Sequence, residues 1–99
     1  MSYRVEILPE AMDQTRELAE WWSENRPVSR VNIKRAVRQI GDSLRSMPRR
    51  FPYDEQRDVH RANLKGTPYY LLFEIDEERR LVQILSVWSG QRGEGPDLG

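Results

Sequence analysis

The segment YYLLFEID, residues 69–76, is the most informative part of this sequence for the fold. Its first five residues are all apolar or aromatic, so side chains would be buried on both faces of a strand formed there. A strand that is apolar on both faces is typical of the middle of a sheet. We therefore predict that residues 69–76 form a central strand and that the rest of the chain is arranged around it.

Two further strands are predicted next to this segment along the chain. Residues 59–64, VHRANL, form a weak strand before it, and residues 81–88, LVQILSVW, form a last strand after it. The connections at 65–68 and 77–80 are short and consist of turn-forming or charged residues. Strands joined by short turns pair antiparallel, so these three strands are expected to form a meander.

The first half of the chain predicts one strand and two helices. Alternating apolar and charged residues at 2–8 indicate a half-buried strand, at the edge or beside the middle of the sheet. A helix is expected from Pro9 to about residue 25, because proline suits the first helical turn. A second helix is predicted with Ser29 as its N-cap and with Pro48 as its stop.

Each predicted helix has one apolar face. The residues on these faces are Ala11, Thr15, Leu18, Ala19 and Trp22 in the first helix, and Ile33, Ala36, Val37, Ile40, Leu44 and Met47 in the second. The short break between the helices favours an antiparallel hairpin, and residues 48–58 are predicted to be an irregular loop. The predicted fold is α+β with the order β-α-α-β-β-β, a helical hairpin packed on one face of a mainly antiparallel four-stranded sheet.

The composition excludes several classes of protein. A chain of 99 residues fits a single domain over residues 1–99, with residues 90–99 expected to be a flexible, glycine-rich tail. The absence of cysteine and the single histidine exclude disulfides, thiolate nucleophiles and cysteine- or two-histidine metal sites, and no cofactor is implied. With no apolar run near the ~20 residues of a membrane span and no signal-peptide pattern, a cytoplasmic location is expected.

The net charge of zero conceals a segregation of charge. Residues 26–65 contain eleven basic and four acidic residues, whereas residues 1–25 and 66–99 are both net acidic. A basic middle segment either attracts phosphate or an acidic partner, or is a solvated helix face balanced by acidic neighbours in space. The sequence leaves both interpretations open.

The ordered combination of these elements resembles the toxins of bacterial type II toxin–antitoxin modules, in the RelE/ParE superfamily. The similar stretches are the opening YRVEILPEA, the first helix with Trp21 and Trp22, RANLKGTPYYLLFEID, and the closing VQILSVWSGQR, within residues 3–92. The resemblance implies a small cytoplasmic toxin that is neutralised by a cognate antitoxin. It also implies one of two targets: RelE-like members cut mRNA on the ribosome without a metal, and ParE-like members poison DNA gyrase.

The positions that RelE-like enzymes use for RNA cleavage are only partly present. Such chemistry needs a base, an acid and cations that stabilise charge on the phosphate. By resemblance, Tyr70 stands where an arginine is expected in the central strand, and Arg61 and Asn63 stand at two basic positions of the preceding strand. Gly90 stands near the place of a further arginine, with Arg92 two residues beyond, and the C-terminal tyrosine is absent. The chain therefore departs from the nuclease pattern.

Other aromatic and titratable residues have two interpretations each. His60 is a candidate general acid or base because its ordinary pKa is near neutral, or else a histidine at a surface or an interface. Strand alternation puts His60 and Arg61 on opposite faces, and it separates Tyr69 from Tyr70 in the same way. One of the two tyrosines is therefore expected in the core, and the other is available to a base or a partner.

The remaining candidates lie on the first helix and after the last strand. Trp22 belongs to the apolar face, while Trp21 lies at its edge and packs over the rim of the sheet or against a partner. Trp88 is either an interface anchor or a rim-packing residue. Arg92 ranks first among the candidate functional residues, since family members often have an arginine at this point.

We interpret the chain as a growth-inhibiting, ParE-like toxin that binds a protein target such as DNA gyrase, and not as an enzyme. The residues predicted to contact a target or partner are Arg92, Trp88, Arg61 and Trp21. One alternative is a ribosome-dependent, metal-free mRNA endoribonuclease that would use Arg61, Arg92, His60 and Tyr70. A further alternative is a degenerate toxin that only binds its antitoxin.

Overall fold

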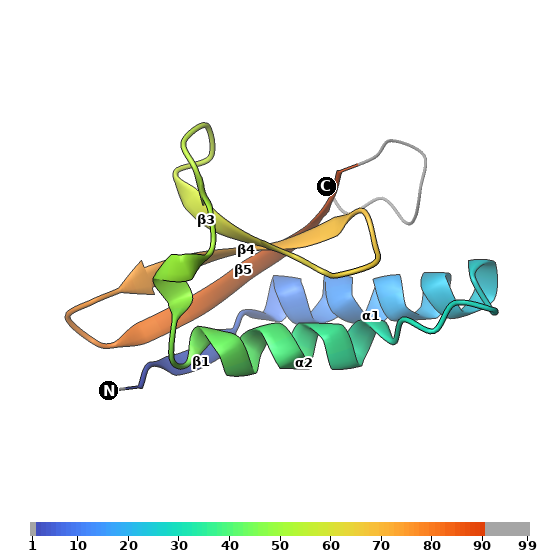
Figure 1. Cartoon of the computed structure of the whole chain (residues 1–99), viewed down its shortest axis with the longest axis horizontal. Coiled ribbons are helices and arrows are strands. Elements are labelled where there is room, and N and C mark those ends of the chain that lie inside the picture. The colour runs from blue at the N-terminus through green and yellow to red at the C-terminus, as the bar shows by residue number, and fades with distance from the viewer. Residues whose placement is uncertain (1, 91–99) are drawn as a thin grey trace.

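The computed structural model describes residues 2–90, in which a helical hairpin covers one face of a five-stranded sheet (Figure 1). The elements are β1 (Arg4–Ile7), α1 (Pro9–Asn25), α2 (Ile33–Leu44), the 3-10 turn η1 (Pro48–Arg50), β2 (Tyr53–Asp54), β3 (Val59–Asn63), β4 (Tyr69–Asp76) and β5 (Leu81–Ser89). The α+β class and the hairpin on one face are confirmed. The prediction of four strands is wrong by one, because β2 was not foreseen.

The strands lie in the order β1-β5-β4-β3-β2, so β4 is central, as its apolar sequence predicts. β3, β4 and β5 pair antiparallel and form the expected meander. β1 occupies an edge and pairs parallel to β5, with Val5 opposite Val82 and Ile7 opposite Ile84. The two helices that follow β1 supply the long connection that a parallel arrangement needs.

The extra strand β2 lies inside the segment 48–58, which the sequence predicts to be irregular. Tyr53 pairs with His60 and Asp54 pairs with Val59, which adds β2 to the outer edge of β3. A strand of two residues is too short to show an alternating pattern. Only the pairing partner on β3 makes this segment a strand.

The two helices run antiparallel and contact each other, as predicted (Figure 1). The bounds of α1 agree with the prediction. The predicted N-cap of the second helix is wrong: the side chain of Asn32 accepts a hydrogen bond from the backbone N–H of Arg35 at 2.9 Å. The hydroxyl of Ser29 instead accepts from the N–H of Val31, within the preceding turn. α2 also ends at Leu44, earlier than Pro48 suggests.

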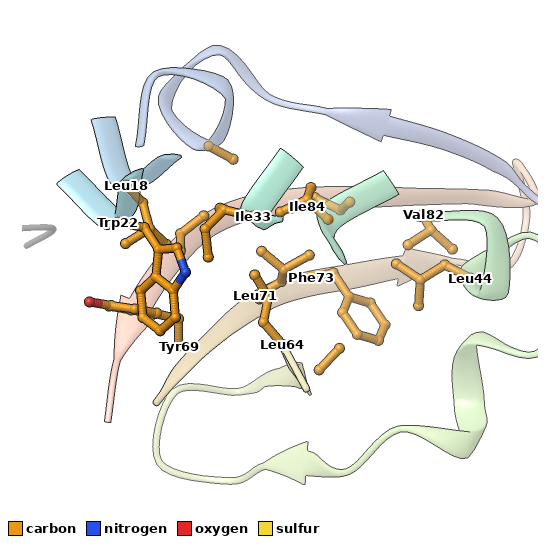
Figure 2. Packing of buried hydrophobic residues seen from close by; sticks show 14 residues of the cluster. Leu18, Trp22, Ile33, Leu44, Leu64, Tyr69, Leu71, Phe73, Val82 and Ile84 are labelled. Atoms are coloured by element: carbon orange, nitrogen blue, oxygen red, sulfur yellow. The ribbon is translucent and has the colours of Figure 1, made fainter. Parts of the chain in front are cut away.

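The main core lies between the hairpin and the sheet (Figure 2). Leu18 and Trp22 of α1 pack here, and the Trp22 ring meets the Tyr69 ring edge-on with 5.9 Å between centroids. Phe73 in the middle of β4 is fully buried and meets Phe51 edge-on. Met47, placed on the apolar face by the sequence, is exposed because the helix has already ended.

The helices also protect the part of β5 that extends beyond β1. Just after the end of β1, the backbone N–H of Leu8 donates a hydrogen bond to the carbonyl of Ile84 in β5. Further along, the side-chain oxygen of Gln14 on α1 accepts from the backbone N–H of Val87 at 2.7 Å. A helix side chain thus satisfies a strand N–H that no neighbouring strand reaches.

Candidate functional site

The face of the sheet opposite the helices presents a small cluster of apolar and aromatic side chains, which we call the open face. Residues paired directly across strands lie on the same side of a sheet. Asn63 is opposite Tyr70, which is opposite Trp88. In the next such row Arg61 is opposite Leu72, which is opposite Ser86. The buried members of the cluster are Val59, Tyr70 and Leu72, with Leu85 and Trp88 packed beside them.

A β-bulge in β5 decides which residues reach the open face. Leu72 pairs with Ser86 and Phe73 pairs with Ile84, so Leu85 has no residue opposite it on β4. The extra residue lets both Leu85 and Trp88 join the open-face cluster while Ile84 stays in the main core. The indole N–H of Trp88 donates to the Ser86 hydroxyl at 2.9 Å, which holds the ring along the strand.

Arg61 covers the buried tyrosine of this face. Its guanidinium carbon lies 4.1 Å from the centroid of the Tyr70 ring, close enough for a cation–π interaction. A guanidinium nitrogen of Arg61 also lies 3.5 Å from the side-chain oxygen of Asn63, at the long limit of a hydrogen bond. Arg61 thus has the aromatic ring of Tyr70 beneath it and no carboxylate partner among residues 2–90.

A second arginine, Arg57, covers Trp88 in the same way. It comes from the loop between β2 and β3, and its guanidinium carbon lies 4.7 Å from the Trp88 ring centroid. The carboxylate of Asp54 accepts from the Arg57 side chain at 2.8 Å and from its backbone N–H at 3.1 Å. The side-chain bond, and then the backbone bond, lower the pKa of Asp54, and the Asp54 bond raises the pKa of Arg57. The positive charge of Arg57 is therefore balanced by the adjacent Asp54 carboxylate.

The open face is acidic at its other end. Glu6 of β1 lies opposite Gln83, and Gln83 lies opposite Glu74 of β4. The neighbours of Glu6, Val5 and Ile7, pack into the main core, so the Glu6 side chain points to the open face. The Gln83 amide donates to the Glu6 carboxylate at 3.4 Å. One sheet face thus has arginines and aromatic rings at one end and carboxylates at the other.

The structure brings together only some of the candidate residues proposed from the sequence. Arg61, Tyr70 and Trp88 meet on the open face. His60 lies on the helix-covered side, where its ring stacks on Phe73 with 5.3 Å between centroids. Its Nδ1 is buried and has no hydrogen-bond partner in the described part of the chain. His60 and Arg61 therefore do not serve one site, as strand alternation predicts.

The other two candidates lie elsewhere. Trp21 is half-buried on α1 and packs against the main core, away from the open-face cluster. Arg92 lies outside the described residues, so its candidacy stays a prediction, as does that of the 90–99 tail.

Arg57 and Asp54 were not among the candidate residues. Both lie in a segment that the sequence predicts to be an irregular loop, and the loop is brought to Trp88 only by the pairing of β2 with β3. The spacing of an aspartate three residues before an arginine is the signal that was available. An aspartate three residues before an arginine is common on protein surfaces, and it does not predict that Arg57 lies over the Trp88 ring.

Neither a metal site nor a membrane span is found in the described part of the chain. No group of three or more His, Asp or Glu side chains within residues 2–90 could hold a metal ion. None of the helices there is both long enough and apolar enough to cross a bilayer.

Comparison with known proteins identifies the class. The family model described as the ParE toxin of the type II toxin–antitoxin system, parDE, matches residues 5–93. The chain therefore belongs to the ParE toxin family and is a type II toxin of the RelE/ParE superfamily. No protein among the curated sequences matches it.

Solved structures of related toxins share the fold. One match is the toxin–antitoxin complex RelBE2 from Mycobacterium tuberculosis, with 26% identity, a TM-score of 0.67, and coverage of 90% of this chain and 99% of the other. A second is the isolated E. coli RelE toxin, with 19% identity, a TM-score of 0.63, and coverage of 93% and 88%. The intact E. coli RelBE complex matches with 20% identity, a TM-score of 0.56, and coverage of 91% and 99%.

Proposed function

We propose that this toxin acts by binding a protein target, such as DNA gyrase, through the arginine- and aromatic-rich end of its open face, and that a cognate antitoxin neutralises it. The observation that supports this most directly is the composition of the open face. It offers Trp88 and Arg61 above a buried apolar cluster formed around Tyr70 and Leu72. Tryptophan, tyrosine and arginine are the residues that contribute most often to protein–protein binding energy.

The same face is poorly suited to hold the phosphates of RNA. One of its two arginines at this end is paired with Asp54, which leaves Arg61 as the cation available there within residues 2–90. The carboxylates of this face lie at its other end, with Glu74 four residues beyond Tyr70 on β4, so they do not add to or screen the charge at Arg61.

The position of His60 also weighs against RNA cleavage at this face. A general base must reach the proton that it removes, directly or through one water. His60 lies on the helix-covered side, stacked between Phe73 and Tyr53. The described part of the open face thus has no histidine. The nuclease interpretation would need groups from beyond residue 90.

The antitoxin half of the proposal rests on the relatives. The M. tuberculosis relative was solved as the toxin–antitoxin complex RelBE2, and it is similar to this chain over nearly its full length. A cognate antitoxin, sought among the open reading frames next to the toxin gene and co-expressed with this chain, is expected to restore growth and to co-purify with the toxin.

Two parallel assays with the purified full chain test the choice of target. The first measures supercoiling and DNA cleavage by gyrase, and the second follows mRNA integrity in reconstituted translation. We expect inhibition of gyrase and intact mRNA. The Arg61→Ala and Trp88→Ala variants should each lose at least tenfold in inhibitory potency, about 1.4 kcal/mol of binding.

Arg16→Ala is the matched control, because Arg16 is an exposed arginine on α1 that pairs with Asp13. It should inhibit gyrase as the unchanged chain does. Specific mRNA cuts that disappear in Arg61→Ala or Arg92→Ala would overturn the proposal in favour of the endoribonuclease. Normal growth on expression without antitoxin would instead favour a toxin that only binds its antitoxin.

A further inference from the structure

The short hairpin of β2 and β3 places Asp54 at the rim of the open face. Asp54 pairs with Val59 on β3, and Val59 belongs to the open-face cluster, so the Asp54 side chain lies on the same side of the sheet. The Asp54 carboxylate accepts from both the side chain and the backbone N–H of Arg57. Only 10% of the Asp54 side chain is exposed, so this ion pair is screened less by water than one at an open surface.

Two aromatic rings lie side by side beneath the two arginines of this end. Tyr70 is paired with Trp88 across β4 and β5. The guanidinium carbon of Arg61 lies 4.1 Å from the Tyr70 ring centroid, and that of Arg57 lies 4.7 Å from the Trp88 ring centroid. A surface that holds a single-stranded nucleic acid uses cations for the phosphates and aromatic rings for the bases. By residue type alone, this end of the open face would suit such a strand as well as a protein.

Asp54 withdraws one of the two cations from a nucleic acid. A phosphate that approaches Arg57 must break the hydrogen bond of 2.8 Å to the carboxylate and then lie beside the negative charge of Asp54. A protein partner does not meet this cost. It can pack apolar groups on the Trp88 ring and on the aliphatic stem of Arg57 while the ion pair stays intact.

The other end of the sheet contains the same local motif in a different setting. Asp76 precedes Arg79 by three residues, accepts from its backbone N–H at 3.2 Å, and lies 3.7 Å from its side chain. The Asp76 and Arg79 side chains are 44% and 76% exposed. Within residues 2–90 no aromatic ring lies beneath Arg79. The motif is therefore an ordinary surface turn there, and only the position beside Trp88 gives the Asp54 pair a further effect.

We propose that Asp54 is a specificity-determining residue of the open face: by holding Arg57 in an ion pair over Trp88, it makes this surface select a protein over a single-stranded nucleic acid. This inference rests on the proposed function, in which the open face is the surface that binds the target. Arg57 keeps its contact with the ring, but its charge is used within the chain.

Binding of a labelled 12-nucleotide single-stranded RNA to the full chain, followed by fluorescence anisotropy, tests this role. Asp54→Asn keeps an oxygen that can accept from the Arg57 backbone N–H, but it removes the charge that holds the guanidinium. We expect this variant to bind the RNA at least fivefold more tightly than the unchanged chain at low salt. The slope of log K against log salt should steepen by about 0.7, the value for one added phosphate contact on a single strand.

Asp76→Asn is the matched control, because it makes the same change of charge in the same motif at the other end of the sheet. It should change RNA binding less than twofold. The double variant Asp54→Asn/Arg57→Gln has the net charge of the unchanged chain and no released cation, so it should bind RNA within twofold of the unchanged chain. Asp54→Ser, which also keeps an oxygen for the backbone N–H, should give the same gain as Asp54→Asn.

Several results would overturn this role of Asp54. One is an RNA affinity that does not rise in Asp54→Asn or in Asp54→Ser, with circular dichroism showing that both variants are folded. An equal gain in Asp76→Asn would mean that net charge alone attracts the RNA. A gain that survives the loss of Arg57 would mean that another group binds the phosphate.

The role of Asp54 and the choice of target can fail separately. If the unchanged chain does not inhibit gyrase but Asp54→Asn gains RNA affinity through Arg57, the target is wrong and the exclusion of nucleic acid by Asp54 stands. If gyrase inhibition depends on Arg61 and Trp88 but RNA binding does not respond to Asp54, the proposed function stands and this inference is wrong.

Discussion

The two faces of one sheet differ in how their side chains are covered. On the helix-covered face, Leu71 and Phe73 of β4 are fully buried beneath the hairpin (Figure 2). On the open face, Tyr70 and Leu72 of the same strand are covered by side chains alone, among them the guanidinium of Arg61. The same strand therefore supplies a permanent core on one side and a surface that a partner can reach on the other.

The difference sets apart the side chains on which stability depends from those that a partner can reach. Apolar area that lies beneath the two helices stays out of water as long as the chain is folded. The burial of this area contributes to the free energy of unfolding. An arginine stacked on an aromatic ring limits the exposure of that ring to water, yet the guanidinium can turn toward a partner. We expect substitutions on the two faces to have different consequences.

The largest difference should appear between the adjacent residues Leu71 and Leu72. Leu71→Ala leaves a cavity in the main core and should lower the free energy of unfolding by about 2–5 kcal/mol. Leu72→Ala should cost about 1–2 kcal/mol, because the smaller open-face cluster relaxes and admits water. Urea unfolding monitored by tryptophan fluorescence measures both. Equal losses would mean that the open face is as much a core as the covered one.

The contact between α1 and the edge of β5 gives the next largest effect. Gln14→Ala removes the acceptor of the Val87 backbone N–H and leaves a part-buried donor unsatisfied, which should cost about 1–3 kcal/mol. Gln14→Glu keeps an acceptor oxygen and serves as the matched control in the same unfolding experiment. If alanine and glutamate at this position are equally stable, the hydrogen bond does not protect this edge.

Trp88 should separate binding from stability. Trp88→Ala is expected to lower the free energy of unfolding by only about 1 kcal/mol, since the residue is half-buried, but to reduce target inhibition at least tenfold. Trp22→Phe on the covered face should do the reverse, with reduced stability and unchanged inhibition per folded molecule. Thermal unfolding and the gyrase assay on the same preparations provide both readouts.

The smallest effect should be an acid dependence due to Asp54. Its pKa is lower in the folded chain, first because the Arg57 side chain donates to it, so the unfolded chain binds more protons. This contribution to stability is present at neutral pH and is lost as the pH falls below about 4. Asp54→Asn should therefore flatten the decline in stability between pH 7 and pH 3.

Glu20→Gln, at an exposed position on α1, is the control for that measurement. It should leave the decline in stability unchanged. An Asp54→Asn variant that loses stability with acid as steeply as the unchanged chain would show that the ion pair with Arg57 does not hold in solution.

Local patterns in the sequence were sufficient to predict where β4 and α1 begin and end, but not where α2 does. The bounds of β4 and α1 follow from an apolar run and from helical spacing after Pro9, because each pattern repeats within the element itself. The alternation of side chains along a strand also predicts that His60 and Arg61, and likewise Tyr69 and Tyr70, lie on opposite faces of the sheet. The N-cap of α2 was misplaced because both Ser29 and Asn32 can cap a helix, and backbone geometry chose Asn32.

The fold class, the order of the longer elements and the central place of β4 all follow from local residue patterns. Contacts between distant parts of the chain are needed to place β1 parallel to β5, to join residues 53–54 to the sheet and to bring Arg57 over Trp88. These two groups of features differ in the range of the interactions that specify them. The periodicity of a helix or strand is a property of neighbouring residues in the sequence. Strand pairing and the stacking of an arginine on a ring join residues that are far apart in the sequence and meet only in the folded chain.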